Sequence, residues 1–176
     1  INKGDDRNPN IRSGLVAKDF KTDNMPELFA GTPPLEAMRV LISEAATIGQ
    51  YDRVVMVDDV RRAFFYAKAL RPVWVELPDE DYSEEDMKED MVGKLEMSLY
   101  GTRDAAQNWE EAYASMLTSA GFTRGKATPC AFHHAGRAIR VIVHGDDFVA
   151  GGPTAHLQWF KQLMDGRFEC KHTEVG

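Results

Sequence analysis

The sequence predicts an α+β domain in which a largely antiparallel sheet packs on helices. Segments with strand-like alternation and segments with helical apolar spacing are mixed along the chain, without a regular strand–helix alternation. The acidic pair Asp146-Asp147 separates two apolar runs at the spacing of a β-hairpin. A length of 176 residues and an apolar fraction of 43% suit one compact domain better than two.

The N-terminal part predicts one strand and one helix. Residues 15–20 can form a short strand. A helix is expected after Thr32, which can cap it, and after Pro33 and Pro34, which fit the first helical turn. Gly49 is expected to end this helix. The side chains expected to face inward are Leu35, Met38, Ile42 and Ala45.

The middle of the chain predicts short strands and a charged excursion. Residues 54–57 are a continuous apolar run of the kind that is buried on both faces of a sheet. Residues 73–77 alternate and end at a proline, and residues 94–99 suit another short strand. Residues 79–90 hold eight acidic residues and one basic residue, and this balance equals the net charge of −7 of the whole chain. We expect an exposed acidic segment, helical over 84–90, which leaves room for a basic groove elsewhere.

The C-terminal part predicts two helices, a hairpin and an edge strand. A long helix is expected over 104–121, and strands 139–143 and 148–150 flank the acidic hairpin turn. Pro153 opens a second helix, and residues 167–173 suit an edge strand. The apolar stripe of the long helix consists of Ala105, Trp109, Ala112, Tyr113, Met116, Leu117 and Ala120.

The cysteines and paired histidines predict no separate metal site. Cys130 and Cys170 are 40 positions apart, which is no metal-ligand spacing and indicates reduced thiols in a cytosolic or nuclear protein. His133 and His134 precede Gly136, and we interpret them as a surface turn rather than as ligands. No run of about 18 uncharged apolar residues occurs, so no membrane helix is predicted.

Two acidic pairs are expected at strand ends. Asp58-Asp59 follows the run 54–57, and Asp146-Asp147 lies in the predicted hairpin. If the strands are neighbours, the carboxylates converge, and two such charges about 4 Å apart repel by roughly 4 kcal/mol at an effective dielectric constant of about 20. A divalent cation such as Mg²⁺ relieves this repulsion and keeps positions for phosphates. Each pair by itself is more typical of a solvated turn.

Several short blocks share their order with a known polymerase family. They read Leu15-Val-Ala-Lys-Asp-Phe20, Glu27-Leu-Phe-Ala30, Arg39-Val-Leu-Ile42, Asp59-Val-Arg-Arg-Ala-Phe64, Val73-Trp-Val-Glu-Leu-Pro78, Ser98-Leu-Tyr-Gly101 with Trp109, Gly121-Phe122 with Pro129-Cys-Ala-Phe132, and Val143-His-Gly-Asp-Asp-Phe148. In this order they resemble the reverse transcriptase domain of copia-type (pseudovirus-type) LTR retrotransposons. The resemblance extends over almost the whole chain.

The resemblance implies a right-hand polymerase palm with partial fingers. The reverse transcriptase domain would extend over residues 1–176, with partial fingers in 1–50 and the palm in 51–176. The acidic segment 79–90 would be an insert in the palm. The thumb, RNase H, protease and integrase domains of the family are expected to lie outside this chain, which would be a polyprotein fragment or a decayed copy.

The resemblance also implies the catalytic residues. Asp59, Asp146 and Asp147 would bind the metal ions and carry out nucleotidyl transfer to a primer 3′-hydroxyl, with RNA-directed DNA polymerase activity. The Val60 carbonyl would complete one coordination shell. Phe64 would lie beneath the sugar of the incoming nucleotide, where a rigid ring excludes a 2′-hydroxyl.

The remaining implied contacts concern phosphates and nucleic acid. Lys18 and Arg12 would bind the triphosphate, and Gly101 and His144 would contact template and primer. Asp58 is left out because neighbours on a strand face opposite sides. The implied cofactors are two Mg²⁺ ions, with Mn²⁺ as an alternative. The implied partners are an RNA or DNA template with its primer, deoxynucleoside triphosphates and the other Pol polyprotein domains. Binding to a membrane is not implied. The expected locations are the cytoplasm, in a virus-like particle, and the nucleus.

Departures from the family pattern keep other interpretations open. Gly14 stands where the family has Arg, Asp104 where it has Gln, and His144-Gly145 where it has Tyr-Val. Together with the missing thumb they fit a degenerate or co-opted palm domain that binds nucleic acid or protein without catalysis. An unrelated metal-dependent phosphotransfer or hydrolase domain would use the same acids, but it would leave Ser98-Leu-Tyr-Gly101 without a purpose.

Overall fold

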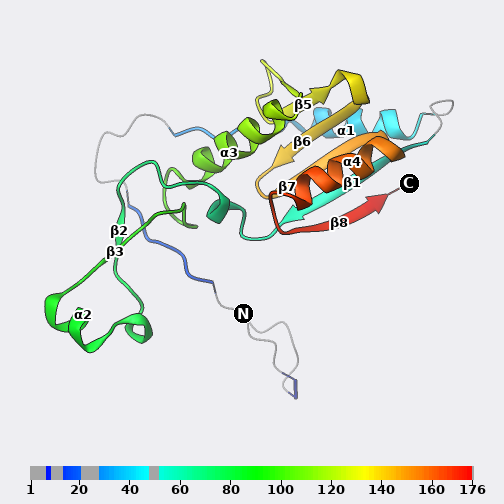
Figure 1. Cartoon of the computed structure of the whole chain (residues 1–176). Helices are drawn as coiled ribbons and strands as arrows, with labels where there is room; N and C mark the ends of the chain where they lie inside the picture. The colour runs from blue at the N-terminus through cyan, green and yellow to red at the C-terminus, as the bar shows by residue number, and fades with distance from the viewer. Residues whose placement is uncertain (1–6, 9–13, 21–27, 48–51, 176) are drawn as a thin grey trace.

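A six-stranded antiparallel sheet forms the centre of the protein (Figure 1). The computed structural model describes residues 7–8, 14–20, 28–47 and 52–175. The strand order is β4-β5-β6-β7-β1-β8, and a separate sheet pairs β2 with β3. The strands are β1 (Arg53–Val60), β2 (Trp74–Val75), β3 (Gly93–Lys94), β4 (Thr123–Arg124), β5 (Ala131–His134), β6 (Ile139–His144), β7 (Asp147–Pro153) and β8 (Cys170–Val175).

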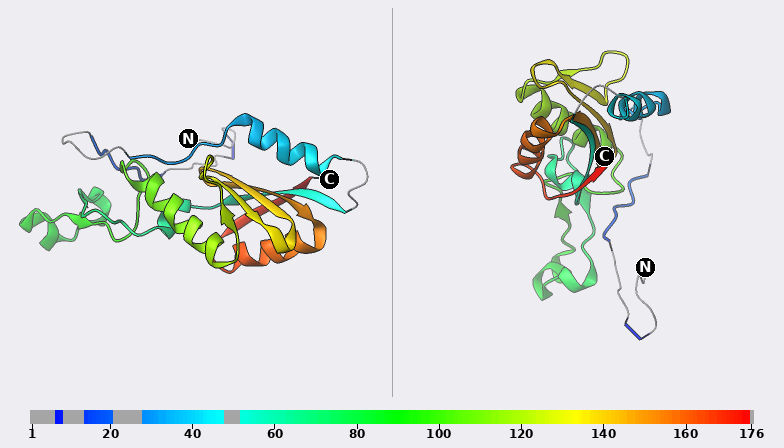
Figure 2. Two further views of the ribbon diagram at one scale, coloured as in Figure 1. Left: turned by 90° about the horizontal axis from the view of Figure 1, so that it is seen from above. Right: turned by 90° about the vertical axis from the view of Figure 1, so that its right-hand side faces the viewer.

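Helices cover both faces of this sheet. The α-helices are α1 (Leu35–Ala45), α2 (Glu84–Glu89), α3 (Ala105–Ser119) and α4 (Thr154–Asp165). Three short 3-10 helices are η1 (Ala63–Tyr66), η2 (Asp79–Asp81) and η3 (Ala135–Arg137). Helix α1 lies on one face, and α3 and α4 lie on the other (Figure 2). This arrangement confirms the predicted α+β class with its antiparallel sheet. None of the helices in the described ranges has the length and apolar character needed to cross a bilayer.

The main core lies between the sheet and helices α3 and α4. The predicted stripe of α3 is confirmed, because Trp109, Tyr113 and Leu117 are buried against strand residues such as Phe148. Gly121 follows the helix with φ +95°, a conformation that suits glycine and ends the helix as predicted. The hairpin of β6 and β7, helix α4 after Pro153, and the edge strand β8 also form as expected.

Helix α1 forms where it was predicted, and its predicted inward face is right in part. Met38 and Ala45 pack against the core as predicted, beside the buried Leu41. Leu41 lies next to Gly151. Leu35 and Ile42 are more than half exposed, so the prediction was wrong for these two side chains. Thr32 provides no cap: the helix begins after Pro34 without a side-chain hydrogen bond. Gly49, the predicted end, lies outside the described residues.

Three further local predictions are corrected by the structure. Residues 15–20 form no strand, although Ala17 N–H donates one backbone hydrogen bond to the Tyr100 carbonyl at 2.8 Å. The predicted strand over 94–99 shrinks to Lys94 in β3 and an isolated bridge at Met97. His133 and His134 lie in strand β5 rather than in a turn.

The acidic segment extends from the two-stranded sheet, away from the main body (Figure 1). Helix α2 begins at a capping box in which the Ser83 hydroxyl accepts from Asp86 N–H and the Asp86 carboxylate accepts from Ser83 N–H. No residue of α2 is buried. The predicted helix within this segment is therefore confirmed.

Candidate active site

Three predicted carboxylates gather at one end of the central strand pair. Strands β1 and β7 are antiparallel, and their register places Asp59 directly opposite Asp147. Asp146 lies in the preceding turn, where its carbonyl accepts a hydrogen bond from Val60 N–H at 3.0 Å. Opposed residues of an antiparallel pair have Cβ atoms about 4.5–5.5 Å apart, so the Asp59 and Asp147 side chains are close neighbours. All three aspartates are exposed.

The turn that carries Asp146 is fixed from the core below it. The buried Trp109 indole N–H donates a hydrogen bond to the Gly145 carbonyl at 2.8 Å. Gly145 has φ +65°, and a Cβ at this position would meet no atom within 4 Å. The glycine therefore serves the left-handed turn conformation that the two-residue hairpin needs. Helix α3 thereby sets the position of the acidic turn.

The negative charges of Asp59, Asp146 and Asp147 lie close together and repel one another. Partial burial raises the pKa of Asp147, and the charges of Asp146 and Asp59 raise it further. The charge of His144, which stands opposite Asp147 in the β6–β7 register, acts in the other direction. In the described part of the chain, no group of three or more His, Cys, Asp or Glu side chains could hold a metal ion as it stands. The cluster thus has oxygen donors and uncompensated charge, but no closed metal cage.

Tyr100 belongs to this site, and the sequence reasoning missed it as a site residue. Burial raises the pKa of its hydroxyl, as do the nearby charges of Asp146 and Asp59, while hydrogen bonds with the Ala63 and Phe64 backbone lower it. The hydroxyl is therefore near both the carboxylates and the start of η1. The block Ser98-Leu-Tyr-Gly101 was the available signal.

Phe64 lies on η1, five positions after Asp59. Its ring is half-buried, packs against the main core and lies 4.4 Å from the Tyr100 ring, centroid to centroid. Phe64 thus packs on the tyrosine whose hydroxyl is near the carboxylates. Because the ring is held by these contacts, it can act as a core residue, and its exposed part can contact a ligand.

Gly101 permits a close approach of the segment that carries Lys18. Gly101 has φ +91°, and a Cβ there would lie 2.0 Å from the Ala17 carbonyl oxygen and 2.7 Å from Val16 Cγ1. Only glycine fits this position. Lys18 itself is exposed, while Arg12 lies outside the described residues. Of the two residues predicted to bind the triphosphate, the structure describes only Lys18. It lies on a segment that packs against Tyr100 and Gly101.

Asp104 occupies the N-cap position of helix α3. It makes no side-chain cap hydrogen bond. Its carboxylate instead accepts from Arg71 Nη2 at 3.3 Å and from Asn108 Nδ2 at 3.2 Å. Arg71 also pairs with Asp19, whose carboxylate accepts from Arg103 N–H at 3.1 Å. Asp104 thus ties residues 14–20 to the start of α3.

Asp58 faces the opposite side of β1, as its position next to Asp59 predicted. It is 0% exposed, and its Oδ1 lies 2.7 Å from His172 Nδ1. His172 Nε2 lies 2.7 Å from Asp165 Oδ1 at the end of α4. Burial raises the pKa of Asp58, more than His172 lowers it. Burial by itself would lower the pKa of His172, but hydrogen bonds and charges from the two aspartates raise it.

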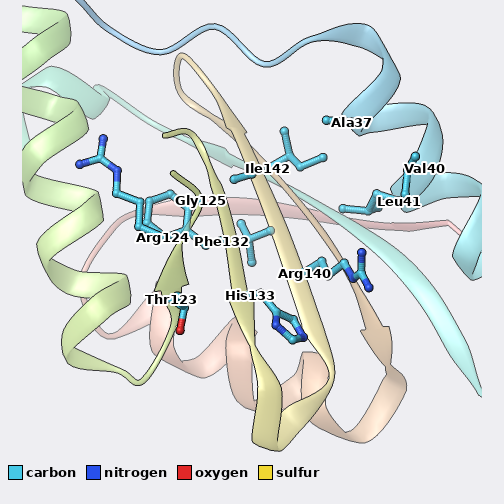
Figure 3. Close-up of a pocket in the computed structure, with 12 residues that line it drawn as sticks. Ala37, Val40, Leu41, Thr123, Arg124, Gly125, Phe132, His133, Arg140 and Ile142 are labelled. Carbon is cyan, nitrogen blue, oxygen red and sulfur yellow. The ribbon is translucent and has the colours of Figure 1, made fainter. Parts of the chain in front are cut away.

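Two cavities differ in their relation to these residues. A surface cavity of about 450 Å³ is lined by Asp59, Val60, Arg61, Arg62, Asp146 and Glu169. A cavity of about 540 Å³ lies between α1 and strands β4 to β6 (Figure 3). Its lining is mostly apolar, and none of the 12 residues drawn there is a predicted site residue. The smaller cavity is therefore the one that belongs to the candidate site.

Comparisons with known proteins agree with the resemblance found in the sequence. Residues 2–175 match the family described as reverse transcriptase (RNA-dependent DNA polymerase). A retrovirus-related Pol polyprotein from transposon TNT 1-94 of Nicotiana tabacum is 28% identical over 132 residues, which are 73% of this chain and 10% of that protein. The chain thus spans about a tenth of the length of this relative. No solved structure matches the chain with significance.

Proposed function

The chain belongs to the reverse transcriptase (RNA-dependent DNA polymerase) family, and from this premise we propose that Asp59, Asp146 and Asp147 catalyse RNA-directed DNA synthesis. The fold would be the palm of a right-hand polymerase with part of the fingers. The observation that carries the proposal is the register of β1 and β7, which sets Asp59 opposite Asp147 beside the Asp146 turn.

The donor set fits magnesium, and manganese as an alternative. Carboxylate oxygens are hard ligands, and Mg²⁺ is commonly held by one or two carboxylates with substrate phosphates filling other positions. The raised pKa of Asp147 reflects charges that a cation would neutralise. The Val60 carbonyl would supply a further oxygen. When bound, two such ions would activate the primer 3′-hydroxyl and stabilise the leaving pyrophosphate.

The protein's own residues would position the reactants. The primer 3′-oxygen attacks the α-phosphorus of a deoxynucleoside triphosphate, the bond to the β-phosphate breaks, and the hydroxyl proton is released. Trp109 holds the acidic turn through the Gly145 carbonyl, which keeps the carboxylates in place during this step. The Phe64 ring would lie beneath the sugar, and Lys18 and Arg12 would attract the triphosphate. Gly101 and His144 would contact template and primer.

The wider context is also proposed from the family. The template would be RNA or DNA with an annealed primer, and the other domains of a Pol polyprotein would complete the enzyme. The setting would be a virus-like particle in the cytoplasm, or the nucleus. The acidic segment 79–90 would lie away from the nucleic acid, because its charges repel phosphates.

Primer extension tests the proposal. Purified protein is incubated with an RNA template, a labelled DNA primer, deoxynucleotides and Mg²⁺, beside an Asp146→Asn variant. We expect extended primer from the parent and none from the variant. Absence of extension by a parent that still binds the primed template would contradict catalysis and favour a non-catalytic palm domain.

A further inference from the structure

The cavity beside the catalytic carboxylates is lined by both acidic and basic side chains. Its acidic lining residues are Asp59, Asp146 and Glu169, and its basic ones are Arg61 and Arg62. Arg61 lies two positions beyond Asp59, which places it on the same face of the chain as it leaves β1. A cation and an anion can therefore bind next to each other in one cavity.

One carboxylate holds both arginines. Arg61 Nη1 lies 2.7 Å from Glu169 Oε1, and Arg62 Nη2 lies 3.1 Å from Glu169 Oε2. Arg61 N–H also donates to the Glu169 carbonyl at 2.9 Å, which fixes the two segments next to each other. Two arginines that share one glutamate leave this group of three side chains with an excess positive charge. The structure thus offers more guanidinium donors than Glu169 can satisfy.

These ion pairs are suited to exchange. The side chains of Arg61, Arg62 and Glu169 are 63%, 69% and 44% exposed. Exposed ion pairs contribute little stability, so the arginines lose little by leaving Glu169. Each arginine makes one close contact with Glu169, whereas a phosphate group can accept two parallel hydrogen bonds from a guanidinium.

Lys171 does not line the cavity, but it lies on the strand next to Asp59. The β1–β8 register places Lys171 opposite Asp59, and both residues are exposed. Asp59 therefore has an acidic neighbour, Asp147, on one strand and a basic neighbour, Lys171, on the other. A ligand that spans these neighbours needs a cation at one end and anionic oxygens at the other.

We propose that Arg61 and Arg62 bind the β- and γ-phosphates of the incoming nucleotide and the pyrophosphate that leaves, and that Glu169 holds the two arginines until phosphate displaces it. This inference rests on the proposed function, since it places the metal-bound phosphates beside Asp59 and Asp146. A nucleic-acid backbone is less suitable, because its phosphates are single and spaced, whereas this cavity sets two arginines within reach of one pair of metal-binding carboxylates.

Calorimetric titration with inorganic tripolyphosphate and Mg²⁺ at low salt tests the proposal without requiring polymerase activity. We expect Arg61→Gln/Arg62→Gln to weaken binding at least roughly ten-fold, as the loss of charge-assisted hydrogen bonds does. Glu169→Gln should tighten binding several-fold, because it frees both arginines. Arg39→Gln on α1, which does not line the cavity, should match the parent. Circular dichroism and thermal unfolding should show all variants folded.

The outcomes separate this inference from the proposed function. Parent-like binding by the double arginine variant, or weaker binding by Glu169→Gln, would overturn the inference even if primers are extended. Tripolyphosphate binding that follows the expected order in a protein without extension activity would support the site and contradict the polymerase proposal. If the double variant loses binding of a single-stranded oligonucleotide as strongly as binding of tripolyphosphate, the arginines serve the nucleic-acid backbone and the inference fails.

Discussion

Asp58 and Asp59 are adjacent in sequence, yet they belong to two different regions of the molecule. Asp59 lies on the exposed end of β1, opposite Asp147 and beside the Asp146 turn. Asp58 is 0% exposed and is bridged through His172 to Asp165 on α4. The alternation of a strand separates them. On the exposed face, none of the described hydrogen bonds joins the Asp59 carboxylate to a basic side chain. On the buried face, the Asp58 carboxylate has His172 as its partner.

Strand β1 therefore has an exposed end and a buried face with different energetics. Crowded like charges at the exposed end cost stability and create a demand for a cation. On the buried face, hydrogen bonds offset the cost of burying a carboxylate, although Asp58 Oδ2 has no hydrogen-bond partner. We infer that the exposed face carries the chemistry and that the buried face holds β1, β8 and α4 together.

The largest expected effect follows from neutralising the exposed face. Asp59→Asn should lower primer extension by a factor on the order of 10³ or more, as the loss of a group that stabilises transition-state charge does. The free energy of unfolding should stay the same or rise slightly, because like-charge repulsion falls. Steady-state extension rates and urea unfolding measure the two quantities. A variant that loses its fold rather than its activity would remove the distinction between the two faces.

The buried face should show the opposite pattern. Asp58→Ala removes the acceptor of the His172 ring and should lower the free energy of unfolding by roughly 3 kcal/mol, the scale for breaking a buried pair. Chemical denaturation of the parent and the variant gives this difference. Unchanged stability would mean that the Asp58–His172–Asp165 contact contributes nothing to the fold.

Phe64 is half-buried, so its ring can contribute both to core packing and to contact with a ligand. Phe64→Val should raise ribonucleotide incorporation relative to deoxynucleotide by roughly thirty- to more than a hundred-fold, since a clash of about 2–3 kcal/mol corresponds to that ratio. Competition assays with matched nucleotide pairs measure the preference. If the variant keeps the parent's sugar preference while losing stability, Phe64 is a packing residue alone.

Trp109 connects the two regions, since a buried side chain supports the exposed turn. Trp109→Phe leaves the Gly145 carbonyl without its indole donor and should lower the free energy of unfolding by about 1–3 kcal/mol. It should also weaken Mn²⁺ binding, because the acidic turn loses its support. Trp159→Phe, in a partly buried tryptophan on α4, is the control and should leave Mn²⁺ binding unchanged. Equal metal affinity in both variants would argue against a positioning role.

The smallest effect is a pH dependence from the buried face. The pKa of His172 is raised above its ordinary value of 6.5, so its stabilising contacts are fully present below that value and are lost as pH rises through the raised pKa. Stability should therefore fall above about pH 6.5, by less than the effect of Asp58→Ala. His172→Gln should flatten this part of the profile. Urea unfolding between pH 5.5 and 8.5 makes the comparison, and a parent that gains stability over this range would contradict it.

The sequence predicted the exposed region better than the buried one. A hairpin with Asp146-Asp147 and an apolar run before Asp59 are local patterns, so their positions follow from short stretches of chain. Asp58 contacts His172, and His172 in turn contacts Asp165. Both residues are more than 100 positions from Asp58, and only the β1–β8 register and the packing of α4 bring the three together. No local pattern carries that information.

Two other differences have similar physical reasons. Residues 15–20 have strand-like composition, but the described contacts give them one backbone hydrogen bond, from Ala17 to Tyr100, instead of a ladder. Helix α1 has apolar side chains around much of its circumference, so its periodicity could not select Leu41 over Ile42. In both cases tertiary contacts, rather than the local sequence, determine the conformation of residues 15–20 and the buried face of α1.

The central claim is that Asp59, and not its neighbour, belongs to a metal-binding face. Electron paramagnetic resonance titration with Mn²⁺ tests it directly on the parent, Asp59→Asn and Asp58→Asn, each first shown to be folded. We expect the parent and Asp58→Asn to bind Mn²⁺ with similar affinity and Asp59→Asn to bind at least about ten-fold more weakly, as the loss of a ligating charge requires. Binding by Asp59→Asn that equals the parent's, or loss of binding in a folded Asp58→Asn, would contradict the claim.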